Sequence, residues 1–341
     1  MRIQITVLMI STCVLGSDWR TAGLHPAVTS AAVSGNPASA VFEPTLGYVV
    51  KSSLPEVRPI SGTPVAARTG DAIVLPRGIQ SVFAGPSAAY AISGEGSGGL
   101  GVLSFATLSD RPIDGTTGNY SFIAYSPSGA SVVAVSDSNR AQIITGLPDV
   151  PRIIWTIDNI ATPAATTTND GGMVLFAEGG QVLLALKDGS RTVVYQGDRI
   201  VDIAMSPDGT YAAAADAGLH QVVLIEKLQT TPSTRVVASG AGDPSRIAFL
   251  RSGQVLLVAD TIQSVALAID IASGSANRIS LPQAATTMQP ISSGDAVLLT
   301  VPSDGAPGWL FGWSGDSARV WMIPGVPANN SSAGVGHGRR R

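Results

Sequence analysis

The chain has 341 residues, a formal net charge of −3 and only 13% charged residues, with no block of like charges. This balance argues against a nucleic-acid partner, because nucleic acids favour a basic protein face. Aromatic residues make up 5% of the chain, which argues against extended stacking platforms for sugars or bases. The 38 Gly and 22 Pro are spread along the chain, as expected for an all-β protein with many turns.

The N-terminus has the pattern of a secretory signal peptide. A basic start, Met1-Arg2, precedes a mostly apolar run over residues 3–16, which is typical of export signals. We therefore expect a signal segment over residues 1–23 and a secreted or periplasmic protein. Two alternatives stay open, namely a segment retained as a membrane anchor or lipidated at Cys13, and no export at all. Cys13 is the sole cysteine, so a cleaved chain would lack disulfide and thiol chemistry.

The rest of the chain divides into three parts. Residues 24–44 are rich in Ala, Ser, Gly and Pro, and residues 325–341 are rich in Gly, Ser and Asn, so both are predicted to be disordered. Residues 45–324 are predicted to form a single domain. No apolar run in it approaches the ~20 residues of a membrane span, so we expect no span in the mature chain.

Within that domain, residues 203–240 form one complete structural unit. Four short apolar strands are separated by turns, the first of which is Ser206-Pro207-Asp208-Gly209. Pro and Asp preset such a turn and Gly supplies its positive φ. The turn glycine recurs at intervals of 38 to 44 residues: Gly129, Gly171, Gly209, Gly253 and Gly294. Four strands repeated at this period predict a β-propeller built of four-stranded blades.

Six repeats are nearly complete. Their first strands are expected near Val82, Ile123, Thr166, Ile203, Ile247 and Met288. Upstream, residues 48–50 and 57–60 look like the last two strands of a partial seventh blade, whose first pair would have to come from the C-terminus. Pro59 predicts an edge position for the second of these strands, since Pro cannot donate to a ladder. The alternative is six blades preceded by an N-terminal hairpin.

Two of the turns support a resemblance to a known group. Residues 123–129 (IAYSPSG) and 203–209 (IAMSPDG) resemble the hairpins of bacterial YVTN/WD40-like propellers. The Trp-Asp and Gly-His pairs of true WD40 repeats are absent. The resemblance covers about residues 80–324 and implies an exported binding or scaffold module. Some relatives are lactonases, but no residue selects that branch.

Candidate site residues gather on one predicted face. The loops between second and third strands and the connections between blades should share this face, which we call the top face. Its candidate ligand-binding residues are Asp137, Arg140, Glu178, Asp198, Asp216, His220, Asp243 and Asp260. If their carboxylates point at the axis of the propeller, the acidic residues would suit a cation or a polyol. Their recurrence in several blades favours instead a structural role in which each Asp bonds nearby backbone amides.

No convergent catalytic set is visible in the sequence. His220 is the one histidine of the predicted folded part, so neither a zinc site nor a Ser–His–Asp triad is expected. We therefore expect a monomeric, non-catalytic module without a cofactor, which binds a protein or a small polar ligand. The alternative is a lactonase-like or sugar-acid hydrolase with a divalent cation at the axial mouth, held by Asp198, Asp216 and Asp260, because hard cations take oxygen ligands.

Overall fold

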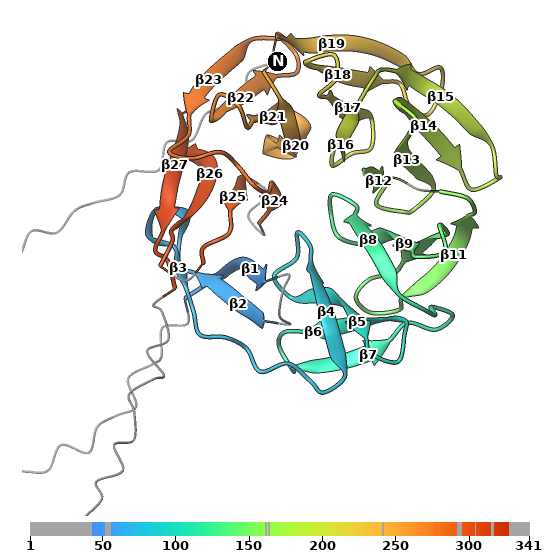
Figure 1. Ribbon diagram of the computed structural model, residues 1–341, viewed down its shortest axis with the longest axis vertical. Helices are drawn as coiled ribbons and strands as arrows, with labels where there is room; N and C mark the ends of the chain where they lie inside the picture. The colour runs from blue at the N-terminus through green and yellow to red at the C-terminus, as the bar shows by residue number, and fades with distance from the viewer. Residues whose placement is uncertain are drawn as a thin grey trace, which may run out of the picture. The chain divides into compact units, whose positions relative to one another are not determined.

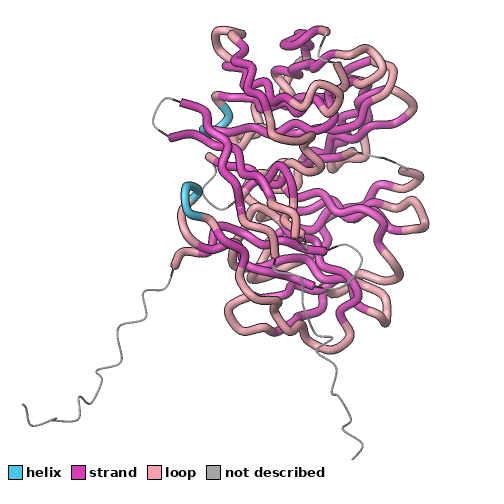
Figure 2. Tube along the Cα trace, turned by 60° about the vertical axis from the view of Figure 1, so that its left-hand side comes forward, coloured by secondary structure: helices cyan, strands magenta, loops and turns pink. Residues whose placement is uncertain are grey.

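A computed structural model describes residues 43–51, 56–160, 162, 164–240, 242–291, 295–303, 305–314 and 317–326. The predicted signal segment 1–23 lies outside these residues, as do most of the predicted linker 24–44 and tail 325–341. The described part is built of strands and two three-residue 3₁₀ helices, η1 (Pro64–Ala66) and η2 (Arg251–Gly253) (Figure 2). No helix among the described residues is long and apolar enough to cross a membrane.

The strands form seven antiparallel sheets arranged in a ring (Figure 1). Blade 1 contains β1 (Thr45–Lys51), β2 (Glu56–Ser61) and β3 (Arg68–Thr69). Blade 2 contains β4 (Ile79–Ala84), β5 (Tyr90–Glu95), β6 (Leu100–Ser104) and β7 (Ser109–Pro112). Blade 3 contains β8 (Tyr120–Tyr125), β9 (Ser131–Ser136), β10 (Ala141–Thr145) and β11 (Arg152–Ile157). Blade 4 contains β12 (Ala165–Thr167), β13 (Met173–Glu178), β14 (Gln181–Leu186) and β15 (Arg191–Gln196).

The three remaining blades repeat the same order of strands from the axis outward. Blade 5 contains β16 (Ile200–Met205), β17 (Tyr211–Asp216), β18 (Gln221–Glu226) and β19 (Ser233–Ser239). Blade 6 contains β20 (Pro244–Leu250), β21 (Val255–Asp260), β22 (Val265–Asp270) and β23 (Ala276–Ser280). Blade 7 contains β24 (Gln289–Pro290), β25 (Ala296–Thr300), β26 (Gly308–Ser314) and β27 (Ser317–Ile323). The predicted all-β propeller is therefore confirmed, with seven blades.

The predicted origin of the N-terminal blade is wrong. β1 is the inner strand of its own sheet, followed outward by β2 and β3, and no strand from the described C-terminal residues joins this sheet. An isolated bridge between Val57 and Ile73 extends this sheet. The alternative of six blades plus a separate hairpin is also wrong, because these strands occupy a place in the ring between blades 7 and 2 (Figure 1).

The edge position predicted from Pro59 is wrong as well. β2 lies between β1 and β3, and Pro59 is opposite Tyr48 of β1. The carbonyl of Pro59 accepts a hydrogen bond from the amide of Gly70 on the β3 side. Since the N and C=O of one strand residue point the same way, the missing N–H also faces β3. β3 pairs with β2 over only two residues, so the proline is tolerated there.

The core is divided among the interfaces between neighbouring blades. Seven clusters of buried apolar side chains occur in the described residues, and each draws on two adjacent blades. Leu46 and Ile60 of blade 1 pack with Leu298 and Leu310 of blade 7, which closes the ring. Both faces of each sheet are therefore covered, and this explains the continuously apolar strands. Each large side chain buried in this way contributes about 1.5–3 kcal/mol.

A tyrosine hydroxyl joins blades 2 and 3 within this packing. Tyr125, at the end of β8, donates to the carbonyl of Phe83 at 2.5 Å and accepts from the amide of Ile92 at 2.7 Å. Burial raises its pKa well above the ordinary value, so it stays a neutral donor. A Cβ on Gly85 would lie 2.7 Å from the Tyr125 ring, which explains why this position lacks a side chain.

Replacing Tyr125 with Phe should lower the free energy of unfolding by about 1–3 kcal/mol, because two backbone groups lose their partner. Urea unfolding of the two proteins measures the difference. The matched control is Tyr211→Phe, since no described residue bonds the Tyr211 hydroxyl. Equal losses in the two variants would contradict a specific role for the Tyr125 hydroxyl.

Candidate functional site

The eight predicted residues all lie on the top face or in the strand ends that reach it. Asp216 and Asp260 end the second strands of blades 5 and 6, and both are almost fully buried. Asp198 and Asp243 lie in the connections that lead into these blades. Arg140 and His220 lie in loops between second and third strands. The described residues contain no group of three or more His, Cys, Asp or Glu side chains that could hold a metal ion.

Asp216 binds the backbone of its own loop and of the preceding connection. Its Oδ1 accepts from the amides of Arg199, Gly218 and Leu219, each at 3.1 Å, and its Oδ2 accepts from the Asp198 amide at 3.0 Å. The Tyr195 hydroxyl donates to Oδ2 at 2.9 Å. Burial opposes ionisation, but these hydrogen bonds outweigh it and lower the pKa of Asp216. Five donors use the roughly four lone-pair sites of a carboxylate, so no oxygen is left for a cation.

Asp260 repeats this arrangement one blade further on. Its Oδ1 accepts from the amides of Asp243 at 3.3 Å and Gln263 at 3.0 Å. In both blades a glycine precedes the acidic residue of the connection, and a Cβ on Gly197 or Gly242 would lie within 3.0 Å of the buried carboxylate. The Gly-Asp pair of the connection and the Asp that ends the second strand thus form one structural motif.

Asp137, a predicted ligand-binding residue, does not belong to this motif because it lies one residue beyond the end of β9. Ser136, opposite Tyr120, occupies the position that Asp216 holds opposite Ile200. Glu95 of blade 2, opposite Ile79, occupies the same register position, but its carboxylate accepts from the hydroxyl of Ser97 in its own loop. Glu178 is in register, but its side chain is exposed beside the turn glycines Gly179 and Gly180.

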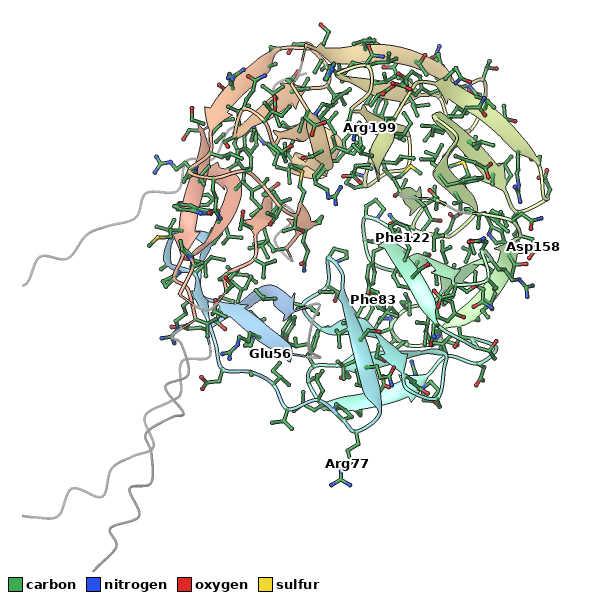
Figure 3. The ribbon with its side chains drawn as sticks, viewed as in Figure 1. Glu56, Arg77, Phe83, Phe122, Asp158 and Arg199 are labelled. Carbon is green, nitrogen blue, oxygen red and sulfur yellow. The ribbon has the colours of Figure 1, made fainter. Side chains whose placement is uncertain are left out.

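Two ion pairs join charged side chains of the top face. Arg140 contacts Asp158 at 3.2 Å, and Arg199 contacts Asp243 at 3.2 Å. Figure 3 shows Asp158 and Arg199 on separate parts of the ring. His220 Nδ1 contacts the carbonyl of Gly242, which ties two loops together. The structure therefore brings five of the predicted residues into adjoining loops of blades 5 and 6, namely Asp198, Asp216, His220, Asp243 and Asp260. The other three lie in blades 3 and 4, namely Asp137, Arg140 and Glu178.

An acidic residue that the sequence did not single out links the inner strands of blades 5 and 6. Asp202 Oδ2 accepts from the amide of Ile247 at 2.8 Å, and its Oδ1 accepts from the amide of Ile203 at 3.0 Å. Burial raises the pKa of Asp202 to about 6, although the Ile247 hydrogen bond and nearby Arg246 oppose the change. Its partner is 45 residues away along the chain, so no local motif signals the contact.

The opposite face, which we call the bottom face, carries a cleft of about 600 Å³ between blades 5 and 6. We call it the acidic cleft. Its lining comes from turns and strand ends of both blades: Asp208, Tyr211, Glu226, Arg235, Gly253, Gln254, Asp270, Ile271 and Ala272. Arg235 Nη2 contacts Glu226 at 3.4 Å and donates to the carbonyl of Ile271 at 3.2 Å. None of these residues was among the predicted site residues.

Two carboxylates of the acidic cleft are held as anions by their own turns. Asp270 accepts from the amide and hydroxyl of Ser273, and these bonds lower its pKa. Burial opposes ionisation of Asp208, but bonds from Ser206 and Thr210 outweigh it and lower that pKa. With one guanidinium against three carboxylates, the lining is negative at neutral pH.

Comparison with solved structures finds similar folds at low sequence identity. A functionally unknown protein from Desulfotomaculum acetoxidans DSM 771 has a TM-score of 0.55 and 16% identity, over 83% of this chain and 100% of that chain. The β-propeller domain of Cps50 (Swd1) from Myceliophteria thermophila has a TM-score of 0.47 and 15% identity, over 60% of this chain and 70% of that chain. Hydrazine synthase from Kuenenia stuttgartiensis has a TM-score of 0.46 and 18% identity, over 62% and 69%.

These similarities concern the fold alone. No family model matches the chain, and no curated protein matches it. Membership of the YVTN/WD40-like group therefore stays a prediction from the sequence.

The raised pKa of Asp202 predicts an unusual pH dependence of stability. Its folded pKa is about 6, against about 3.9 for an unfolded Asp. The folded state therefore holds this proton more tightly, and the stability it contributes is lost as the pH rises from about 4 through 6. Carboxyl groups with a lowered pKa, such as Asp216, have the opposite effect on stability. The stability that they contribute is lost as the pH falls below about 4.

Urea unfolding at several pH values between 4.5 and 7.5 tests this prediction in the wild type and in Asp202→Asn, which cannot titrate. The difference in unfolding free energy between them should change by on the order of 1–3 kcal/mol across the window. Parallel curves for the two proteins would show that Asp202 has an ordinary pKa.

Proposed function

We propose that this propeller is a non-catalytic binding module that accepts a cationic group of its ligand in the acidic cleft. The observation that carries the proposal is that three carboxylates, Asp208, Glu226 and Asp270, line one cleft together with the partly exposed Tyr211. Clefts with a few placed polar groups are the usual form of ligand sites. The β-propeller fold is consistent with a binding or scaffold role, although folds alone do not fix function.

The charges of the cleft favour a cation over an anion. Arg235 is already engaged by Glu226 and by the Ile271 carbonyl, so its guanidinium is partly neutralised. Asp208 and Asp270 stay ionised at neutral pH, since their pKa values are lowered. A guanidinium or ammonium group would donate charge-assisted hydrogen bonds to these carboxylates.

Tyr211 adds an aromatic face to this charge. It lies at the start of β17, opposite Glu226 across the ladder. A cation held between an aromatic ring and a carboxylate gains about 0.5–1 kcal/mol from the ring at a partly exposed site. Export, predicted from residues 1–23, would place this module in the periplasm or outside the cell.

The test uses agmatine, which carries a guanidinium and an ammonium group, with glutarate as the oppositely charged probe. Isothermal titration should detect agmatine binding and no glutarate binding. Glu226→Gln should weaken agmatine binding by about 0.5–1.5 kcal/mol, or about two- to tenfold. The affinity should also fall with added salt, because the attraction is electrostatic.

Asp188→Asn is the matched control for this experiment. Asp188 lies in the corresponding turn of blade 4 and accepts from Ser190 much as Asp270 accepts from Ser273, but it does not line the acidic cleft. Its replacement should leave agmatine binding unchanged. Equal effects of Glu226→Gln and Asp188→Asn would attribute the binding to the overall charge and overturn the proposal.

A further inference from the structure

The acidic cleft is one part of a longer depression on the bottom face. A second cleft of about 380 Å³ shares Tyr211 and Glu226 with it and continues over residues 227–230. A third cleft of about 390 Å³ shares Leu228, Gln229 and Thr230 with the second. The third lies between blades 4 and 5 and we call it the apolar cleft. The three clefts follow one another, because each shares lining residues with the next.

The loop over residues 227–232 forms the middle of this groove, and it is anchored. Leu228 is buried in the core cluster between blades 4 and 5. The amide of Thr230 donates to the carbonyl of Lys227 at 3.0 Å, which closes a turn. The groove therefore has a fixed middle section, and its lining includes the charged residue Lys227 and the polar residues Gln229 and Thr230.

The two ends of the groove occupy equivalent positions in neighbouring repeats. Met173 is opposite Leu186 in blade 4, as Tyr211 is opposite Glu226 in blade 5. Likewise Thr192 is opposite Leu184, as Arg235 is opposite Leu224. The ladder positions that line the two ends thus follow from the repeat, whereas their chemistry does not.

The chemistry differs sharply between these equivalent positions. The apolar cleft is lined by Met173, Leu184, Leu186, Thr192, Leu228, Gln229, Thr230, Thr231 and Pro232, without a charged side chain. In the acidic cleft the positions of Met173, Leu186 and Thr192 are taken by Tyr211, Glu226 and Arg235. A ligand with two different ends would fit such a groove, since each end would meet matching chemistry.

We infer that the groove binds an extended segment of a protein partner, with an apolar side chain in the apolar cleft and a basic side chain in the acidic cleft. The polar middle section offers hydrogen-bonding groups to the backbone of such a segment. Peptide recognition commonly combines a fixed backbone path with separate pockets for side chains. The inference rests on the proposed function of the acidic cleft and adds the apolar cleft, the path between them and the class of partner.

Fluorescence anisotropy with labelled peptides tests the inference on the full chain. The reference peptide carries a leucine and an arginine separated by three serines, and two others replace the leucine with serine or the arginine with glutamate. Peptides with two to five serines between the leucine and the arginine test which spacing matches the two ends of the groove. The wild type should bind the best reference peptide at least tenfold more tightly than the glutamate peptide and at least threefold more tightly than the serine peptide.

Two variants assign these preferences to the two ends. Glu226→Leu gives the acidic cleft the residue of its apolar equivalent, and the preference for arginine over glutamate should fall below threefold. Thr192→Trp fills the apolar cleft from an exposed strand position, and the preference for leucine should disappear while that for arginine stays. Unchanged melting temperatures show that each variant is folded.

The outcomes separate this inference from the proposed function. Arginine preference without leucine preference would leave the acidic cleft as a binding site and overturn the extended groove. Loss of both preferences would overturn both proposals. Clearly tighter peptide binding by a chain lacking residues 327–341, which end in Arg339-Arg340-Arg341, would identify the chain's own basic segment as the occupant instead of a partner.

Discussion

The structure depends on the requirement that every sheet be covered on both faces. Each blade presents apolar side chains to two neighbours, so no blade can bury them alone. The seven clusters between blades meet this requirement only when the ring is closed. No strand crosses the seam between blades 7 and 1 among the described residues, so closure rests on side-chain packing and on a hydrogen bond from the Gln289 side chain to the carbonyl of Tyr48 at 3.3 Å.

The polar groups follow from the same constraint. Buried carboxylates need donors, and the ring supplies backbone amides from the next loop or the next blade. Asp216 accepts a hydrogen bond from the connection that leads into its own blade. Asp202 accepts one from the inner strand of blade 6. These residues join the repeats. The side chains of the proposed ligand site lie where the repeats differ in residue type, as they do between the acidic cleft and the apolar cleft.

The sequence predicted the blades where turn chemistry is strong. The Ser-Pro-x-Gly turns at residues 126–129 and 206–209 set the register of the first two strands, and the structure agrees. The N-terminal blade was misplaced because residues 48–60 lack such a turn, and Pro59 tolerates an inner position only because its missing N–H faces the short strand β3. The sequence did not predict the acidic cleft. Tyr211, Glu226 and Asp270 lie at strand ends without a recognisable motif, and only the packing of two blades brings them together.

Hydrogen exchange of the full chain with Leu310→Ala, at the seam between blades 7 and 1, is the most direct test of this interdependence. Leu310 is fully buried there, and its truncation should cost about 2–5 kcal/mol. If the blades depend on one another, the slowest-exchanging amides of blades 3 and 4, across the ring, should lose as much protection as those beside the seam. Loss confined to blades 7 and 1 would contradict a ring that is stable only when closed.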